Sequence, residues 1–365
     1  MLVRRWMSFT AFAVVLAAGS LLAACGSDNG GGGGGKTIAL LLPESKTARY
    51  EAQDRPKFEA KVKDLCSDCK IIYSNADQDA AKQQQQAEAA LTKGADVMVL
   101  DAVDAASAGA IVAKAKQQKV PVISYDRLIT NADIDYYISY DNEKVGKLQA
   151  DSLTKKLKED GKASGPIPMI NGAPTDNNAK LFKKGATDTF KTNGVKIASS
   201  VDTPDWSPDK AQTEMDQAIT SLGKNGFNGV YAANDGTAGG AIAAMKGAGI
   251  DPSKKPTTGQ DAELAAIQRI VAGEQYMTVY KDITVHEAPD AAQLAVSVAK
   301  GEDVPGGLVN DKTDNGKKSV PSVILSPVAV TRDDIQNTIV KDDFWPANQI
   351  CTAKYASACK SAGIH

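Results

Sequence analysis

Charged and amide side chains follow several apolar runs of the sequence, at the points where buried strands are expected to end. The run VPVISYD (120–126) is β-branched and apolar until it reaches Asp126, and Arg127 follows directly. The same change from apolar to polar recurs after five later runs. The residues at these ends are Asp176 with Asn177 and Asn178, Asp205 with Trp206, Asn234 with Asp235, Asp261, and Lys281, while Arg49 and Tyr50 lie near the end of the first run.

Such a mixture of side chains is suited to binding a neutral polyol. Each sugar hydroxyl both donates and accepts hydrogen bonds; carboxylates accept, Arg and Lys donate, and amides do both. Hydrogen bonds to charged groups contribute about 1.5–3 kcal/mol each, against about 1 kcal/mol for neutral pairs. Aromatic rings can cover the apolar face of a sugar ring. A phosphate ligand would call for a Gly-rich loop at a helix start, and no Walker sequence follows an expected strand. AGG at 238–240 lies inside an expected helix of small residues, where close packing is the simpler explanation.

Most of these positions also have a purely structural interpretation. Asn and Asp at strand ends are commonly turn residues or helix N-caps, and we expect Asp235, just before TAGGAIAAM, to be an N-cap. Asp176 can cap the helix expected from residue 178. Trp206 can anchor a loop, and Lys281 can be a solvated edge charge.

The segments that must position these residues alternate between strand-like and helix-like runs. In open α/β sheets, ligands bind beyond the carboxyl ends of the strands, where these polar residues lie. The alternation predicts parallel sheets with helices on both faces, in two lobes that meet near residues 139–145. The expected strands are 37–43, 70–77, 96–102, 120–126, 136–141, 166–173, 195–202, 229–234, 257–261, 276–281 and 322–330, with helices between them at 51–65, 78–93, 105–118, 142–160, 178–191, 209–222, 237–248, 263–273 and 287–300.

The bulk composition excludes several classes of function. The 365 residues suffice for two domains, and 42% hydrophobic and 24% charged residues are ordinary for a globular protein. A net charge of −2 gives no electrostatic support for a nucleic-acid partner. With only His286 and His365, far apart in the chain, neither a His-based triad nor a multi-histidine metal site is expected, and no cofactor is implied.

The N-terminus predicts an exported, lipid-anchored protein. Arg4 and Arg5 precede an apolar run over 9–24, which is shorter than a spanning helix and ends in LAAC at Cys25. This resembles a bacterial lipoprotein signal, in which Cys25 becomes the lipidated first residue; a plain signal peptide or a short anchor is the alternative. The Gly-rich segment 26–35 is expected to be a flexible tether that spans about 18 Å.

Four further cysteines fit an oxidising location. An exported protein can form disulfides, and a single C-x2-C without a second pair at zinc-finger spacing is a weak metal signal. Of the three possible pairings we favour the local one, Cys66–Cys69 with Cys351–Cys359.

Four long segments of the chain resemble the type I periplasmic sugar-binding proteins, which are the receptors of ABC importers, and in particular the branch that binds D-xylose. These segments are YDRLITNADIDYYISYDNEKVGKLQA (125–150), GAPTDNNAKLF (172–182), NDGTAGGAIAAMKGAG (234–249) and GQDAELAAIQRIVAGEQYMTVYKDIT (259–284). The resemblance implies a two-lobed receptor, expected to be monomeric, that closes on a monosaccharide and docks on a membrane permease. By position, it implies sugar contacts at Arg49, Tyr50 (a tryptophan in the family), Asp126, Arg127, Asn177, Trp206, Asn234, Asp261 and Lys281.

The resemblance also predicts how the lobes divide the chain. We expect Asp126 and Arg127 to hold each other's side chains in position, and crossings between the lobes near 141–144, 281–284 and 311–320. The expected segments are the lipoprotein signal 1–25, the tether 26–35, an N-terminal lobe of 36–142 plus 284–315, a C-terminal lobe of 143–283 plus 316–345, and a C-terminal tail of 346–365.

Two other functions use the same features. A sugar sensor for a membrane kinase or chemoreceptor would have the same fold, and nothing in the sequence separates it from a transport receptor. A carbohydrate-active enzyme would need two carboxylates, which Asp126 and Asp261 can supply, but each is better explained as an acceptor for a ligand hydroxyl. We therefore expect a binding protein and not an enzyme.

Overall fold

The computed structural model describes residues 35–365, which form one compact unit. The expected lipoprotein signal 1–25 with Cys25, and all but the last residue of the tether, lie outside the described residues. Within the described part, no helix is both long and apolar enough to cross a membrane.

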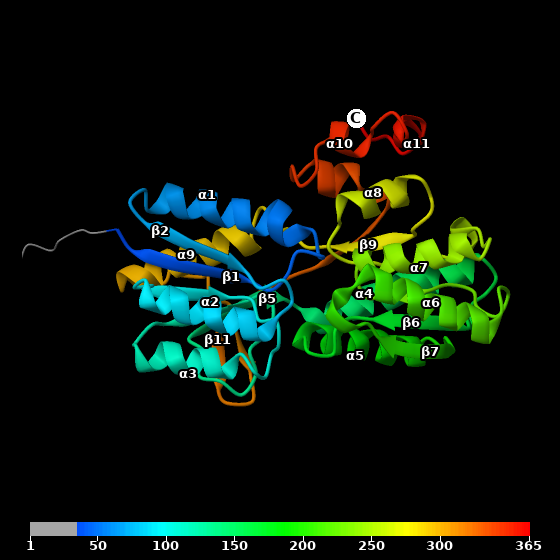
Figure 1. Ribbon diagram of the computed structural model, residues 1–365. Coiled ribbons are helices and arrows are strands. Elements are labelled where there is room, and N and C mark those ends of the chain that lie inside the picture. Colours follow the sequence, from blue (N-terminus) through cyan, green and yellow to red (C-terminus); the bar gives the residue numbers. More distant parts are fainter. Residues whose placement is uncertain (1–34) are drawn as a thin grey trace, which may run out of the picture. The chain divides into compact units, whose positions relative to one another are not determined.

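The N-terminal lobe is a seven-stranded sheet covered by helices on both faces (Figure 1). Alternation along the first strand explains why both faces are covered. Ile38, Leu40 and Leu42 pack into one hydrophobic cluster, while Ala39 and Leu41 pack into another. The strand order is β10 (Asp311–Asp314), β11 (Ser319–Leu325), β5 (Tyr136–Tyr140), β4 (Val122–Tyr125), β3 (Val97–Leu100), β1 (Thr37–Leu42) and β2 (Lys70–Asn75), and all adjacent pairs are parallel except β10–β11.

The helices of this lobe divide between the two faces. Two of them pack against each other on the face of Ile38 and Leu40, and the other two lie on the opposite face. The first pair is α1 (Arg55–Leu65) with α9 (Glu287–Lys300), and the second is α2 (Ala80–Thr92) with α3 (Gly109–Gln117). The helix expected over 51–65 is α-helical from Arg55 only, because Tyr50–Asp54 form a turn of π-helix.

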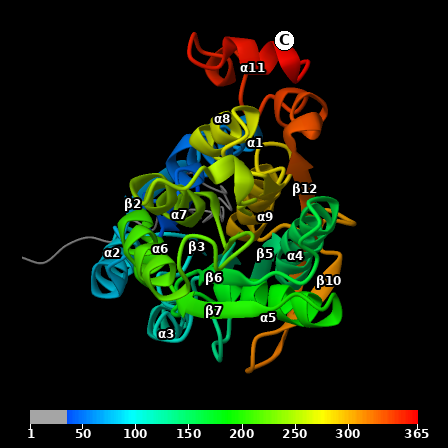
Figure 2. The same cartoon turned by 90° about the vertical axis from the view of Figure 1, so that its right-hand side faces the viewer.

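The C-terminal lobe repeats this layered arrangement (Figure 2). Single bridges, Val230–Thr257 and Gln260–Val279, connect its three-stranded and two-stranded sheets. The strands are β7 (Ile197–Asp202), β6 (Ile167–Asn171) and β8 (Tyr231–Ala232), all parallel, and the antiparallel pair β9 (Met277–Tyr280) and β12 (Val328–Thr331). The helices are α4 (Asn142–Glu159) with α5 (Asn177–Thr192), α6 (Pro208–Leu222) with α7 (Asp235–Gly247), and α8 (Leu264–Val271).

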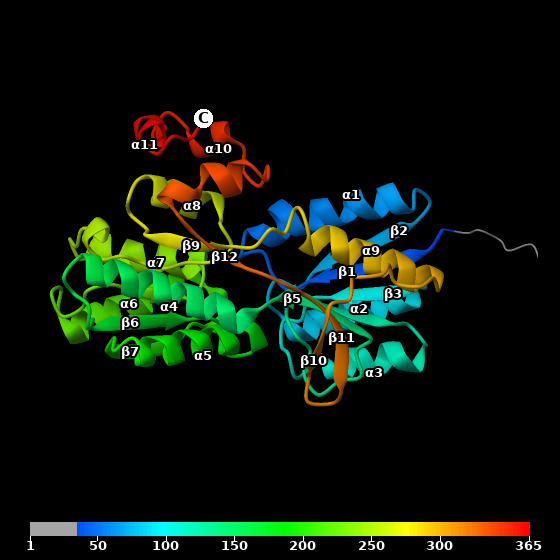
Figure 3. The same cartoon turned by 180° about the vertical axis from the view of Figure 1, so that it is seen from behind.

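Within residues 35–365 the chain passes between the lobes three times, and the third passage differs from the expectation. The first two follow β5 and β9, and the Tyr140 hydroxyl of one donates to Asp282 Oδ1 of the other at 2.8 Å. The third lies between Leu325 and Val328 (Figure 3). The expected crossing at 311–320, and the assignment of 316–325 to the C-terminal lobe, are wrong because β10 and β11 form a hairpin and β11 pairs in parallel with β5. The run 322–330 is two strands, interrupted at Ser326-Pro327.

Both local disulfides expected from the sequence are present. Cys66 is bonded to Cys69, with Cα atoms 5.2 Å apart, and Cys351 to Cys359, at 5.8 Å. The second disulfide closes the C-terminal tail, which contains α10 (Ala347–Ile350) and α11 (Ala356–Ser361). Gln268 of α8 donates to Gln349 O at 3.0 Å, so the tail is attached to the C-terminal lobe.

Candidate functional site

The carboxyl ends of strands from both lobes converge on a small polar cavity. Its volume is about 20 Å³, on a scale on which one water molecule needs about 10–15 Å³. Its lining residues are almost completely buried, so a ligand larger than water can reach it only if the lobes separate. The lining residues are Thr47, Tyr50, Asp126, Arg127, Asp176, Asn178, Phe182, Trp206, Asn234, Gln260, Asp261 and Lys281.

Seven of the nine expected contact residues line this cavity. Arg49 lies behind the wall, buried with 2% exposure. Asn177 is not part of the lining, and its place is taken by Asn178, whose Nδ2 donates to Asp126 O at 2.9 Å. The reason is the residue at which α5 begins. Asp176 is its N-cap and accepts from the Asn178 backbone N–H at 2.8 Å, so Asn177 is the first helical residue and Asn178 is the buried one.

Asp126 is held by partners from several elements. Its backbone is in the left-handed region, with φ of 51°. The Tyr50 hydroxyl donates to Oδ2 at 2.8 Å, and Asn178 Nδ2 lies 3.3 Å from Oδ1. Lys281 Nζ is 3.6 Å and Arg49 Nη2 is 3.9 Å from the carboxylate. Burial by itself would raise the pKa of Asp126, but these cations and the Tyr50 hydrogen bond outweigh burial and hold the pKa well below its usual range.

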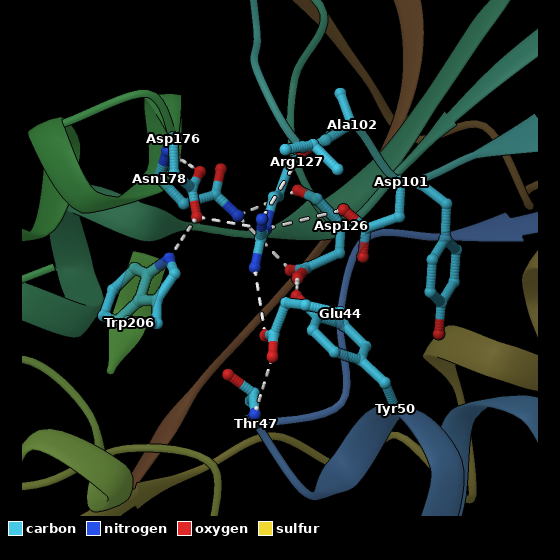
Figure 4. A network of polar contacts seen from close by, with 12 residues as sticks. Glu44, Thr47, Tyr50, Asp101, Ala102, Asp126, Arg127, Asp176, Asn178 and Trp206 are labelled. Carbon is cyan, nitrogen blue, oxygen red and sulfur yellow. Dashed lines mark hydrogen bonds and ion pairs between the residues drawn. The ribbon is translucent and has the colours of Figure 1, made fainter. Parts of the chain in front are cut away.

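Arg127 contacts different side chains from those that contact Asp126 (Figure 4). Its Nε lies 3.1 Å from Asp176 Oδ2 of the other lobe and 3.6 Å from Asp101 Oδ1, and Nη2 lies 3.4 Å from Glu44 Oε1. No ion pair within 4.0 Å joins Arg127 to Asp126 among residues 35–365. The expectation that the two charges hold each other is therefore wrong, because the left-handed turn at Asp126 sends successive side chains in different directions.

Arg49 gathers carboxylates behind the cavity. It makes two hydrogen bonds to Asp54, at 2.6 and 3.0 Å, and one to Glu287 Oε2 at 2.8 Å. Nη1 is also 3.8 Å from Asp261 Oδ1. A buried guanidinium with this many partners is fixed in orientation, so Arg49 supports the positions of Asp126 and Asp261.

Lys281 places one cation between two of the three lining carboxylates, Asp126 and Asp261. Its Nζ lies 3.6 Å from Asp126 Oδ1 and 3.8 Å from Asp261 Oδ1. The rings of Tyr140 and Phe182 have their centroids 5.5 and 5.7 Å from the ammonium group. The side chain comes from the end of β9, where the chain leaves the C-terminal lobe, and it is 2% exposed. The alternative of a solvated edge charge is therefore excluded.

An aromatic wall closes the cavity on the side of the C-terminal lobe. Phe182 and Trp206 make an edge-to-face contact with centroids 6.4 Å apart. Trp206 Nε1 donates to Asp176 Oδ2 at 3.1 Å, which orients the indole. A Cβ at Gly172 would stand 1.9 Å from Trp206 Cη2, so only glycine allows the ring to lie against the end of β6.

Asn234, and not Asp235, is the N-cap of α7. Its side chain accepts from Thr237 N at 2.9 Å, while Thr237 Oγ1 accepts from the Asn234 N–H. Asp235 is fully buried and accepts from Gln275 Nε2, Thr278 Oγ1 and the Glu263 N–H at 2.7–3.0 Å. Burial raises the pKa of Asp235 to about 7. The expected capping role was therefore assigned one residue too late.

Five lining residues were not chosen from the sequence. Asn178 and Asp176 were noted at a strand end, and a correct helix phase would have selected Asn178. Thr47 and Gln260 each lie two residues or fewer from a chosen residue, which is a usable signal. Phe182 lies inside the helical run after Asn178, where an aromatic residue is indistinguishable from a core residue.

The comparisons with known proteins agree with this geometry. A model of the periplasmic binding protein domain matches residues 38–303, so the chain belongs to the periplasmic binding protein family, and its two layered lobes have the type I fold. The chain is 39% identical over 311 residues to the D-xylose-binding periplasmic protein of Haemophilus influenzae, covering 84% of this chain and 90% of the relative. Identity to the Escherichia coli K12 protein of the same description is 36%, with 86% and 92% covered.

A solved structure supports the same fold. The solute-binding protein of an ABC transporter from Clostridium phytofermentans, with bound β-D-glucose, superposes with a TM-score of 0.78 at 30% identity. The match covers 86% of this chain and all of the other chain. The relatives are described as sugar-binding periplasmic proteins, and the solved structure as the solute-binding protein of an ABC transporter.

Proposed function

We propose that the protein captures a monosaccharide, D-xylose foremost, between its two lobes and delivers it to the permease of an ABC transporter. The observation that carries the proposal is the cavity itself. Hydrogen-bond acceptors and donors from both lobes, with an aromatic wall, converge on one point. The names of the relatives support D-xylose as the ligand.

The charges of the site favour an uncharged ligand. Lys281 is shared by Asp126 and Asp261, and Arg127 by Asp176 and Asp101. A sugar hydroxyl can accept from the cation and donate to the carboxylate of the same pair, so the pair stays electrically balanced when a neutral sugar binds. A sugar acid would bring an additional negative charge next to buried carboxylates, which is unfavourable.

The experiment is calorimetry on a panel of monosaccharides. D-Xylose, L-arabinose, D-ribose, D-glucose, D-galactose and D-glucuronate would be titrated into the protein without its leader. We expect one D-xylose bound per chain with the highest affinity of the panel, and no binding of glucuronate. Equal binding of all neutral sugars would refute the choice of D-xylose, and binding of glucuronate alone would refute the neutral-ligand argument.

Delivery and location form the second part of the proposal. The family is extracytoplasmic, and the LAAC sequence at Cys25 supports a lipid anchor on the outer side of the cell membrane. The lobes carry the sugar contacts jointly, so closure is the signal that a permease can read. Small-angle scattering should show a smaller radius of gyration with saturating sugar, and an unchanged profile despite binding would contradict closure.

A further inference from the structure

One contact between the lobes lies beside the cavity and is made by a residue outside its lining. Glu263, in the C-terminal lobe, follows the lining residue Asp261 by two positions. Its Oε1 accepts from the backbone N–H of Ala48, in the N-terminal lobe, at 3.1 Å. Ala48 in turn lies between Thr47, which lines the cavity, and Arg49. The contact therefore depends on the same approach of the lobes that forms the cavity.

The surroundings of Glu263 are predominantly acidic. Asp235 of α7 accepts from the Glu263 N–H at 3.0 Å, and Asp261 lies on the same loop. Arg269 of α8 is the nearby cation, but its Nε donates to Gln275 Oε1 at 3.0 Å and its Nη2 to the Asp235 carbonyl at 2.8 Å. Within residues 35–365, Glu263 takes part in no ion pair with a nitrogen closer than 4.0 Å.

The carboxyl of Glu263 is buried at this contact, with 9% of the residue exposed. Burial, and then the charges of Asp235 and Asp261, raise the pKa of Glu263 to about 8, while the Ala48 N–H and Arg269 only partly oppose this. When the lobes separate, the carboxyl regains water and the largest cause of the raised pKa, burial, is removed, so the pKa falls toward the ordinary value of about 4.3; the simultaneous loss of the Ala48 N–H, which favours the charged form, opposes this fall only in part.

We propose that Glu263 is a positioning residue for the closed form of the protein, and that it takes up a proton when the lobes close on the sugar. The inference rests on the proposed function, because closure is what the sugar drives. The closed form has the higher pKa, so the contribution of Glu263 to sugar affinity is fully present below about pH 4.3 and is lost as pH rises through about 8.

Asp235 also has a raised pKa, but its side-chain partners Gln275, Thr278 and the Glu263 N–H all belong to the C-terminal lobe, so closure leaves them unchanged. Four other buried acids of the cleft differ from Glu263 in having a cation close by. Burial also raises the pKa of Asp101, Asp176, Asp261 and Glu287. Each of these lies between 2.8 and 3.8 Å from a nitrogen of Arg127, Lys281 or Arg49. A nearby cation offsets the cost of the charged form, so the sharpest coupling between closure and protonation falls on Glu263.

The test is calorimetry of D-xylose binding from pH 6 to 9, in phosphate and in Tris, which differ in ionisation enthalpy. For the parent protein we expect uptake of protons on binding near pH 7, seen as a binding enthalpy that differs between the buffers. The affinity for D-xylose should fall as pH rises. For uptake of one proton by Glu263, each rise of one pH unit would lower the affinity by a factor that approaches tenfold. Equal enthalpies in the two buffers would overturn the proposal without any variant.

The variant Glu263→Gln tests whether the Glu263 carboxyl is the group that takes up the proton. The amide oxygen can still accept from the Ala48 N–H and needs no proton, so this variant should lose its part of the pH dependence and bind more tightly than the parent at pH 8.5. Asp290→Asn is the control, because Asp290 is a half-buried acid of raised pKa in α9, and it should leave the profile unchanged. If Glu263→Gln and the parent share one profile, Glu263 is not the coupled group. If no panel sugar binds the parent, the proposed function fails and the inference with it.

Discussion

Replacing Asp126 by alanine should weaken sugar binding far more than it weakens the fold. In the structure the carboxylate is the common partner of Tyr50, Asn178, Lys281 and Arg49, at distances between 2.8 and 3.9 Å. Alanine removes the acceptor and leaves the Lys281 ammonium with Asp261 as its remaining carboxylate within 4.0 Å. The sugar hydroxyl that would donate to Asp126 then loses its charged acceptor.

The size of the effect follows from the burial of Asp126 together with the cations beside it, Lys281 and Arg49. Truncating one member of a buried, hydrogen-bonded charge pair typically costs about 2–5 kcal/mol in binding. Since about 1.4 kcal/mol corresponds to tenfold in affinity, D-xylose should bind roughly thirty-fold to a few thousand-fold more weakly. Asp126 follows β4 and is not part of the hydrophobic clusters, so the protein should still fold.

Calorimetry and thermal melts on two variants separate binding from stability. Asp79→Ala is the matched control, because Asp79 is the exposed N-cap of α2 and accepts from Ala81 N and Lys82 N. It should lower stability by about 0.5–2 kcal/mol and leave affinity unchanged. If Asp126→Ala binds like the parent but melts much lower, Asp126 is a structural charge and its placement in the sugar site is wrong.

Three further predictions use other parts of the chain. Gly172→Ala should weaken sugar binding by displacing Trp206, since the added Cβ would stand 1.9 Å from the indole; unchanged affinity and Trp fluorescence would contradict this. Cys25→Ser should release the protein from the membrane fraction, and equal retention of variant and parent would refute the lipid anchor. Once Cys25 is lipidated, protein purified without reductant should show no reactive thiol because the remaining cysteines are paired; two titratable thiols would exclude one disulfide.

The features that could be predicted from the sequence are those set by local pattern. Alternating apolar and polar segments indicated the layered lobes, and polar residues directly after apolar runs indicated Asp126, Asp261 and Lys281, all of which line the cavity. These predictions succeed because parallel strands end at one edge of a sheet, so the residues just beyond the strands are brought together whatever the exact pairing.

The errors concern helix phase and long-range pairing. A shift of one residue at a helix start exchanges Asn177 for Asn178 and moves the N-cap from Asp235 to Asn234. The residues NDGT (234–237) could have indicated the capping box that Asn234 and Thr237 form. No local pattern indicates the partner of Arg127. That arginine contacts Asp176 in the other lobe, and such a contact depends on how the lobes meet. The same holds for β11, whose pairing with β5 joins segments far apart in the sequence.

The most direct test of a sugar held between the lobes is a crystal structure of the protein grown with saturating D-xylose. We expect one pentose between the lobes at the position of the cavity, which widens to admit it, with hydrogen bonds to Asp126 and Arg127 from the N-terminal lobe and to Asn234 and Asp261 from the C-terminal lobe, and with Trp206 against the ring. A pentose bound to one lobe alone, or elsewhere on the protein with these side chains still paired to one another, would contradict the proposed capture between the lobes.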